Sequence, residues 1–187
     1  MDEIPLALPD ARTRILDAAE AIVQARGVPA LTLEAAARDA GVSKGGLLYH
    51  FASKEALLAG MLGRLAEAIS QEFDDTVAAQ PEGPGRVARA MLAWACDEGA
   101  CEHQDRAAAV FLAAFHHDRV LLDPVRAVFA RMRAALAADG LAPGAGQAVM
   151  CATDGLFMAR VFGLYALDAT EIANLRGALE RLLEPAP

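Results

Sequence analysis

The stretch that decides the fold of this chain covers residues 43–54 and reads Ser43-Lys44-Gly45-Gly46-Leu47-Leu48-Tyr49-His50-Phe51-Ala52-Ser53-Lys54. A serine at each helix start is a typical N-cap, because its hydroxyl accepts a hydrogen bond from a first-turn N–H group that lacks a partner within the helix. The stretch therefore predicts a short helix after Ser43, a tight corner, and the start of a longer helix after Ser53.

A second short helix is predicted just upstream, over residues 32–41. Thr32 is its N-cap, Glu34 lies in its first turn, and Gly41 supplies the left-handed residue that ends it. Two short helices joined by a glycine turn within about twenty residues form a helix-turn-helix. The second helix of that motif is the one that enters a DNA groove.

The composition predicts an all-α protein. The chain has 187 residues, of which 55% are hydrophobic and only 5% aromatic, and alanine, leucine, arginine and glutamate dominate. No apolar run approaches the roughly 18–20 residues that a membrane span requires, so we expect no membrane partner. The acidic N-terminus is unlike a signal peptide, and three cysteines do not make a disulfide framework. We expect a cytoplasmic location.

The net charge of −8 by itself argues against nucleic-acid binding, but the distribution of the charges weakens that argument. Residues 1–60 carry −2 and residues 61–187 carry −6, and the only two lysines, Lys44 and Lys54, both lie in the deciding stretch. An acidic chain with a few placed cations suits a sequence-specific DNA binder better than a non-specific one, because it has no broad basic surface to hold any phosphate backbone.

The remaining helices follow from apolar spacings of three and four residues, with breaks at residues 80–85 and 142–146. Together with the two short helices they make about nine. We expect six of the others over residues 10–26, 53–77, 102–116, 123–138, 146–165 and 170–183, and one more after residue 85 that carries Val87, Met91 and Trp94 inward. A DNA-binding domain over residues 10–56 and a ligand-binding and dimerisation domain over residues 57–184 are predicted.

The arrangement resembles the tetracycline-repressor (TetR) family of bacterial transcriptional regulators. Three runs carry the resemblance, which is specific over about residues 10–62: Ala40-Gly41-Val42-Ser43-Lys44-Gly45, Leu48-Tyr49-His50-Phe51 and Ser53-Lys54-Glu55-Ala56-Leu57-Leu58. Beyond residue 62 only the layout of helices is similar. The chain departs from the family in its acidic N-terminal arm and at Ala36, where members usually carry a larger aliphatic residue.

The resemblance implies a homodimer that places two short helices in successive major grooves of a double-stranded DNA operator. Carried over by position, the DNA-binding residues are Thr32, Ser43, Lys44, Gly45, Gly46, Leu48, Tyr49, His50 and Lys54. Repression is the expectation that the family implies. The helix over residues 146–165 is too apolar to face solvent, and the helix over residues 170–183 adds a row of leucines. We therefore expect two copies of this pair to form an intermolecular four-helix bundle.

The resemblance also implies a small-molecule effector, partly apolar, that releases the DNA. Candidate pocket residues are Trp94, Phe111, Phe115, Asp154, Phe157 and Met158, with Arg160 as an alternative polar group. An ordinary core is the competing interpretation for each aromatic residue. Gly60 and Gly63 lie in the predicted helix over residues 53–77, just past the DNA-binding domain. They are candidates for a hinge or a close helix contact.

Two other classes of function have weaker support in the sequence. Gly41-Val42-Ser43-Lys44-Gly45 fits the pattern of a hydrolase nucleophile elbow, but that motif follows a strand and the sequence predicts none. A metal- or thiol-responsive regulator would use the cysteines and histidines Cys96, Cys101, His103, His116 and His117. Cys96 and Cys101 are five residues apart, a spacing that does not share a helix face. We therefore expect no catalytic residue, metal or cofactor.

Overall fold

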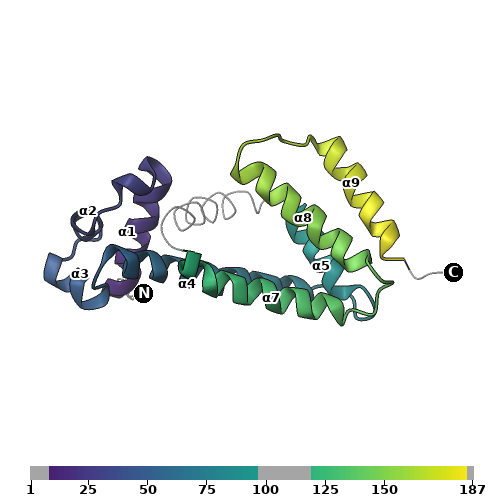
Figure 1. Cartoon of the computed structure of the whole chain (residues 1–187), viewed down its shortest axis with the longest axis horizontal. Coiled ribbons are helices and arrows are strands. Elements are labelled where there is room, and N and C mark those ends of the chain that lie inside the picture. Colours follow the sequence, from purple (N-terminus) through teal and green to yellow (C-terminus); the bar gives the residue numbers. More distant parts are fainter. Residues whose placement is uncertain (1–8, 97–118, 185–187) are drawn as a thin grey trace, which may run out of the picture. The chain divides into compact units, whose positions relative to one another are not determined.

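The computed structural model describes residues 9–96 and 119–184, and every regular element in these ranges is helical (Figure 1). They contain eight α-helices, labelled α1 to α5 and α7 to α9, two short 3-10 helices, η1 and η3, and no strand. This confirms the all-α fold class. The helix predicted over residues 102–116 lies outside the described residues.

The described residues divide into two compact units. The first comprises residues 9–64 and 119–122, and the second comprises residues 65–96 and 123–184. Helix α4 (Lys54–Ala78) gives its first part to the first unit and the rest to the second. No helix within the described ranges has both the length and the apolar character needed to cross a membrane.

The first unit holds the two short helices that the sequence predicts. Along the chain its elements are α1 (Ala11–Arg26), η1 (Val28–Ala30), α2 (Leu33–Asp39), α3 (Lys44–His50), the start of α4, and η3 (Arg119–Leu122). Helix α1 packs against both α2 and α3. The turn between α2 and α3 contains Gly41 at φ 65°, a left-handed conformation that glycine adopts without strain.

Each of the helices α1 to α4 begins at a side-chain cap. The side chains of Asp10, Thr32, Ser43 and Ser53 each accept a hydrogen bond from the N–H group three residues later, at 2.9–3.1 Å. Local sequence therefore determines where these four helices begin.

The core of the first unit consists of aliphatic side chains from all four helices and Phe51. The largest side chains with almost no exposed surface are Ile15, Leu16, Ile22, Leu31, Leu47, Leu57, Leu58, Met61 and Leu62. Phe51 packs closely against the backbone of α4, and a Cβ at Gly60 would lie 2.6 Å from Phe51 Cε1. The absence of a side chain at residue 60 is therefore a packing requirement.

The second unit surrounds its own apolar core. Its further helices are α5 (Arg86–Ala95), α7 (Asp123–Ala137), α8 (Ala145–Val161) and α9 (Ala169–Leu182), and α5 contacts each of the other three. Its buried residues are Phe73, Ala88, Met91, Leu92, Met132, Leu136, Val149, Leu179 and Leu183. Gly146 allows α8 to approach α7, because a Cβ there would lie 2.9 Å from Leu136 Cγ.

Helix α8 is shorter than the sequence predicts. The expectation of residues 146–165 is wrong at its C-terminal end, because the helix stops at Val161 and the chain turns through Gly163 at φ 59°. The Leu164 N–H donates to the Ala159 carbonyl at 2.9 Å, the hydrogen bond that closes a glycine-terminated helix. Apolar residues continue past the end, so hydrophobic periodicity alone does not show the stop.

Candidate nucleic-acid interface and effector-binding unit

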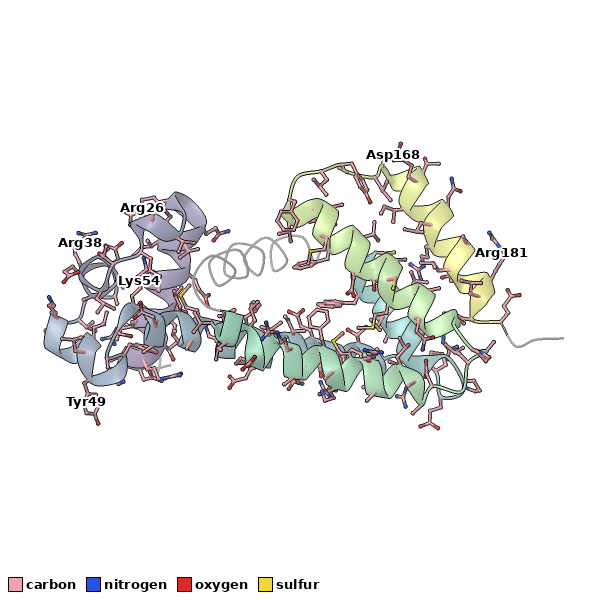
Figure 2. The ribbon with its side chains drawn as sticks, viewed as in Figure 1. Arg26, Arg38, Tyr49, Lys54, Asp168 and Arg181 are labelled. Atoms are coloured by element: carbon pink, nitrogen blue, oxygen red, sulfur yellow. The ribbon has the colours of Figure 1, made fainter. Side chains whose placement is uncertain are left out.

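Helix α3 buries one side and exposes the other. Leu47 is completely buried, whereas Tyr49 is 86% exposed and projects away from the ribbon (Figure 2). The other exposed residues of the helix are Lys44, Gly45 and Leu48. Gly45 and Tyr49 lie on the side of the helix opposite Leu47, and Lys44 and Leu48 lie on its flanks. All four are exposed, so a partner outside the chain can reach them.

The other predicted DNA-binding residues differ in how exposed they are. Thr32 and Ser43 are exposed caps, whereas Gly46, His50 and Lys54 are half-buried. The Lys54 ammonium donates a hydrogen bond to the Val28 carbonyl at 3.3 Å, which ties the start of α4 to η1. The rings of Tyr49 and His50 meet edge-to-face with centroids 5.1 Å apart.

The two adjacent glycines of α3 differ in their surroundings. A Cβ at Gly46 would lie 3.2 Å from the Ser43 hydroxyl oxygen, which accepts the hydrogen bond that caps the helix. A Cβ at Gly45 would have no heavy atom within 4 Å. Packing in the described chain therefore explains a small residue at position 46 but not at position 45.

An ion pair joins the beginnings of α2 and α3. The Lys44 ammonium lies 2.7 Å from Glu34 Oε1, and both side chains are 63% exposed. The hydrogen bond from Lys44 holds the pKa of the Glu34 carboxyl below its usual value. Sequence reasoning assigned Glu34 to the first turn of α2 and missed its contact with Lys44. The two lie ten positions apart, and the turn between them has a geometry that the pattern does not specify.

A second set of charges holds α1 on α4. The Arg64 guanidinium contacts the carboxylates of Asp17 and Glu20, each at 2.6 Å. Burial by itself lowers the pKa of Arg64, but the hydrogen bonds to Glu20 and Asp17 outweigh it and raise the pKa above its usual value. These contacts fix the orientation of the helix that supports α2 and α3.

The hydrolase interpretation of Ser43 lacks the geometry that it requires. Ser43 lies between two helices, and its hydroxyl accepts a hydrogen bond from the Gly46 N–H at 3.0 Å. A nucleophile elbow places its serine between a strand and a helix. The described ranges contain no strand, so Ser43 serves as a helix cap.

The candidate effector residues that the structure describes all lie in the second unit. Trp94, Asp154, Phe157 and Met158 are half-buried, whereas Phe111 and Phe115 lie outside the described residues. The Trp94 indole N–H donates to Glu72 Oε2 at 3.1 Å, a contact that the sequence pattern did not indicate. The aromatic ring of Trp94 packs on the core of the unit.

Asp154 is a half-buried carboxylate of the second unit. Its pKa is raised above the usual value, and the cause is burial. Its carboxylate makes no hydrogen bond or ion pair with any residue in the described ranges. A half-buried carboxylate without such a partner is a place where a cation or a hydrogen-bond donor would bind favourably.

A cavity of about 460 Å³ lies between the C-terminal ends of α5 and α8 and the start of α9. It is lined by Ala95, Cys96, Leu156, Ala159, Arg160, Gly163, Tyr165, Ala166, Leu167, Ala169 and Ile172. Of the residues predicted to form the effector pocket, only Arg160, the alternative polar group, lines this cavity. The six main candidates therefore stay predictions. Burial raises the pKa of the Cys96 thiol, so this thiol is a weaker nucleophile at neutral pH than an exposed one.

Of the residues that the metal hypothesis names, only Cys96 lies within the described ranges. Within residues 9–96 and 119–184, no three histidine, cysteine or acidic side chains are grouped as metal ligands. Cys96 and Cys151 are free thiols. Cys101, His103, His116 and His117 lie outside the described residues.

Two family models match the chain. Residues 15–61 match the family described as bacterial regulatory proteins, tetR family, and residues 85–184 match the tetracyclin repressor-like C-terminal domain. The second match covers more than half of the chain. The chain belongs to the TetR family. It is therefore a TetR-family transcriptional regulator, and α2 and α3 are the helix-turn-helix of its DNA-binding domain.

A curated TetR-type protein extends the similarity. Over 64 residues the chain is 38% identical to the uncharacterized HTH-type transcriptional regulator TtgW of Pseudomonas putida. This match covers 34% of the chain and 48% of TtgW, so the chain spans about half the length of this curated relative.

Solved structures match over nearly the whole chain. The multidrug binding protein EbrR complexed with imidazole is 29% identical, with 96% of this chain and 98% of EbrR covered and a TM-score of 0.66. A TetR-family member from Streptomyces coelicolor is 28% identical, with 95% and 100% covered and a TM-score of 0.67. EbrR has also been solved with ethidium and with malachite green.

Proposed function

We propose that this TetR-family regulator is a repressor that binds a specific operator as a homodimer and releases it when a small molecule enters the second unit. The observation that carries the DNA-binding part is the exposed face of α3, with Tyr49 86% exposed opposite a completely buried Leu47. The residues that would contact DNA are Thr32, Ser43, Lys44, Gly45, Gly46, Leu48, Tyr49, His50 and Lys54.

Each part of this face has a role that follows from its chemistry. The N-termini of α2, α3 and α4 present backbone N–H groups, which attract phosphate oxygens. Lys44 donates to a guanine edge, and Tyr49 and His50 carry polar groups on rigid rings. Gly45 allows the helix backbone to approach the floor of the groove, since a side chain there would project into open space.

The homodimer would form through α8 and α9. Large apolar side chains remain exposed at the end of α8, in the segment that follows it and at the end of α9, namely Phe162, Leu164, Tyr165 and Leu182 at 46–68% exposure. Exposed apolar surface of this kind is typical of a protein–protein interface. Two helix-turn-helix motifs related by a two-fold axis read half-sites about 34–36 Å apart.

The effector class that we propose is an aromatic organic cation. EbrR has been solved with ethidium and malachite green, both of which are aromatic, positively charged dyes. In this chain, Asp154 supplies a half-buried carboxylate without a partner in the described residues, and Trp94 supplies an aromatic surface in the same unit. A cation would lower the cost of burying the Asp154 charge.

Release of DNA would follow from a shift of α4, which belongs to both units. Ligand binding against the second part of α4 would change the separation of the two recognition helices. Because the half-site spacing is set by the pitch of DNA, a displacement of a few ångströms would abolish specific binding while leaving each unit folded.

Fluorescence anisotropy tests this proposal. The protein is titrated into labelled duplex from its own upstream region and into a scrambled duplex, at two salt concentrations, with and without ethidium. Tight binding to the upstream duplex only supports operator recognition. Because ethidium also intercalates into duplex DNA, the ligand part is supported only if ethidium weakens this binding more for the wild type than for Asp154→Asn. Equal weak binding to both duplexes that disappears with salt contradicts operator recognition at that site. Trp94 is the only tryptophan in the chain, so quenching of its emission reports binding to the second unit directly.

A further inference from the structure

Glu34 places a negative charge next to the proposed DNA-binding surface. It lies in the first turn of α2, two residues after the Thr32 cap, and its carboxylate contacts the Lys44 ammonium at 2.7 Å. Both side chains are 63% exposed, so a phosphate or a base edge can reach either of them. Lys44 is one of only two lysines in the chain.

This contact affects specific and non-specific DNA binding differently. Non-specific binding comes from cations that neutralise phosphates, whatever the base sequence. A phosphate that approaches Lys44 must compete with the Glu34 carboxylate for the ammonium, and it is repelled by the same carboxylate. The local arrangement therefore weakens binding to the phosphate backbone at the position where α3 begins.

A base step that contains a G·C pair satisfies both side chains. In the major groove, guanine offers the O6 and N7 acceptors to a lysine, and cytosine offers its N4 amino donor to a carboxylate. Since the two charged groups already lie 2.7 Å apart, they can contact neighbouring bases together without losing their own attraction. A phosphate offers an acceptor to Lys44 but nothing to Glu34.

We propose that Glu34 is a specificity-determining residue of the DNA-binding face, which, through its ion pair with Lys44, penalises phosphate contacts and favours a G·C-containing step. This inference rests on the proposed function, because it requires an operator. It adds to the proposed contacts a residue whose charge has the opposite sign to that usually expected on a DNA-binding surface.

The test compares the wild type with Glu34→Gln, Lys44→Gln and the double variant. Glutamine removes the charge in each case, and in Glu34→Gln it also keeps the size of the side chain. Glu67→Gln is the matched control, since Glu67 is an exposed residue of α4 and its substitution changes the net charge equally. The probes are a duplex that the wild type enriches from a random-sequence pool and a scrambled duplex of the same composition.

We expect Glu34→Gln to bind the scrambled duplex more tightly and to bind the enriched duplex no more tightly than the wild type does. The ratio of the two affinities should fall about fivefold to tenfold, as for loss of one base contact. The slope of log affinity against log salt for the scrambled duplex should steepen by about one. In the Lys44→Gln background the same substitution should leave the salt slope unchanged, because the pair acts as a unit.

Three results contradict the proposal in distinguishable ways. An equal gain for both duplexes, matched by Glu67→Gln, means that only the overall charge matters. If the wild type discriminates between the two duplexes and Glu34→Gln leaves the affinity ratio unchanged, the specificity role of Glu34 is wrong while operator recognition stands. A wild type that enriches no sequence and binds both duplexes equally overturns operator recognition, and the inference with it.

Discussion

The carboxylate of Asp139, which follows the end of α7, caps the N-terminus of α5. Its two oxygens accept hydrogen bonds from the Val87 and Ala88 N–H groups at 3.0 and 2.9 Å, and the Gly85 N–H donates to the Asp139 carbonyl at 2.8 Å. Helix α5 has no cap from the side chain that precedes it. The cap that a serine or aspartate usually provides locally comes here from 51 residues away.

Asp139→Ala should destabilise the second unit. The substitution leaves two N–H groups at the start of α5 without acceptors, so we expect the free energy of unfolding to fall by about 2–3 kcal/mol. Thermal unfolding followed by circular dichroism measures this, with Glu67→Ala, an exposed position of α4 in the second unit, as the control. Equal effects of the two substitutions would show that the cap is not important.

Gly60→Ala and Gly63→Ala should have opposite effects on stability. The alanine Cβ at residue 60 would overlap Phe51, which should cost about 1–3 kcal/mol in the first unit. At residue 63 no atom lies within 4 Å of the added Cβ, and alanine should gain up to about 1 kcal/mol from helix propensity. Chemical denaturation measures both. If Gly63→Ala keeps stability but loses the ligand response, a hinge at residue 63 is indicated.

Gly45→Ala separates folding from DNA binding. We expect the variant to be at least as stable as the wild type, by up to about 1 kcal/mol, because glycine is the poorer helix former and the site has room for a methyl group. Operator affinity should nevertheless fall, since the methyl group would face the groove floor. Anisotropy with the upstream duplex and a denaturation curve are measured together. Unchanged affinity would argue against close approach of α3 at this residue.

Leu182→Glu should weaken the proposed homodimer. Leu182 is 46% exposed near the end of α9, and a charge buried in the interface would raise the dissociation constant by about tenfold or more. Sedimentation equilibrium measures it, and Ala127→Glu on the exposed side of α7 is the control. A wild type that is monomeric at micromolar concentration would refute the dimer itself.

Asp154→Asn should stabilise the protein at neutral pH and weaken the binding of cations. Because burial raises the pKa of the folded carboxyl, the native state binds more protons than the unfolded state, and stability falls as pH rises from about 4 through that raised pKa. The asparagine variant lacks this loss, so its melting temperature should exceed that of the wild type at pH 7, and the difference should shrink toward about pH 4. Ethidium should quench Trp94 less in the variant.

The outcome for Asp154 decides what the residue does. A stability gain together with weaker ethidium binding would mean that the carboxylate is retained for a ligand at a cost in stability. A gain in stability with unchanged ethidium binding would place the effector elsewhere, for example in the cavity lined by Cys96 and Tyr165.

The sequence by itself determined the local structure of the DNA-binding domain. The caps at Asp10, Thr32, Ser43 and Ser53 and the left-handed Gly41 act over three or four residues, so their spacing is enough to locate α1 to α4. The same short-range signals carried the resemblance to the TetR family, which the family models confirm.

The tertiary structure decided the side-chain contacts between helices. The pairing of Glu34 with Lys44, the contact of Trp94 with Glu72 and the cap that Asp139 provides to α5 all join residues that no period in the sequence connects. The sequence alone does not distinguish Gly45, Gly60 and Gly63, because each is a glycine within a helix. Only packing distinguishes them, because the space beside each Cα is set by side chains from other parts of the chain.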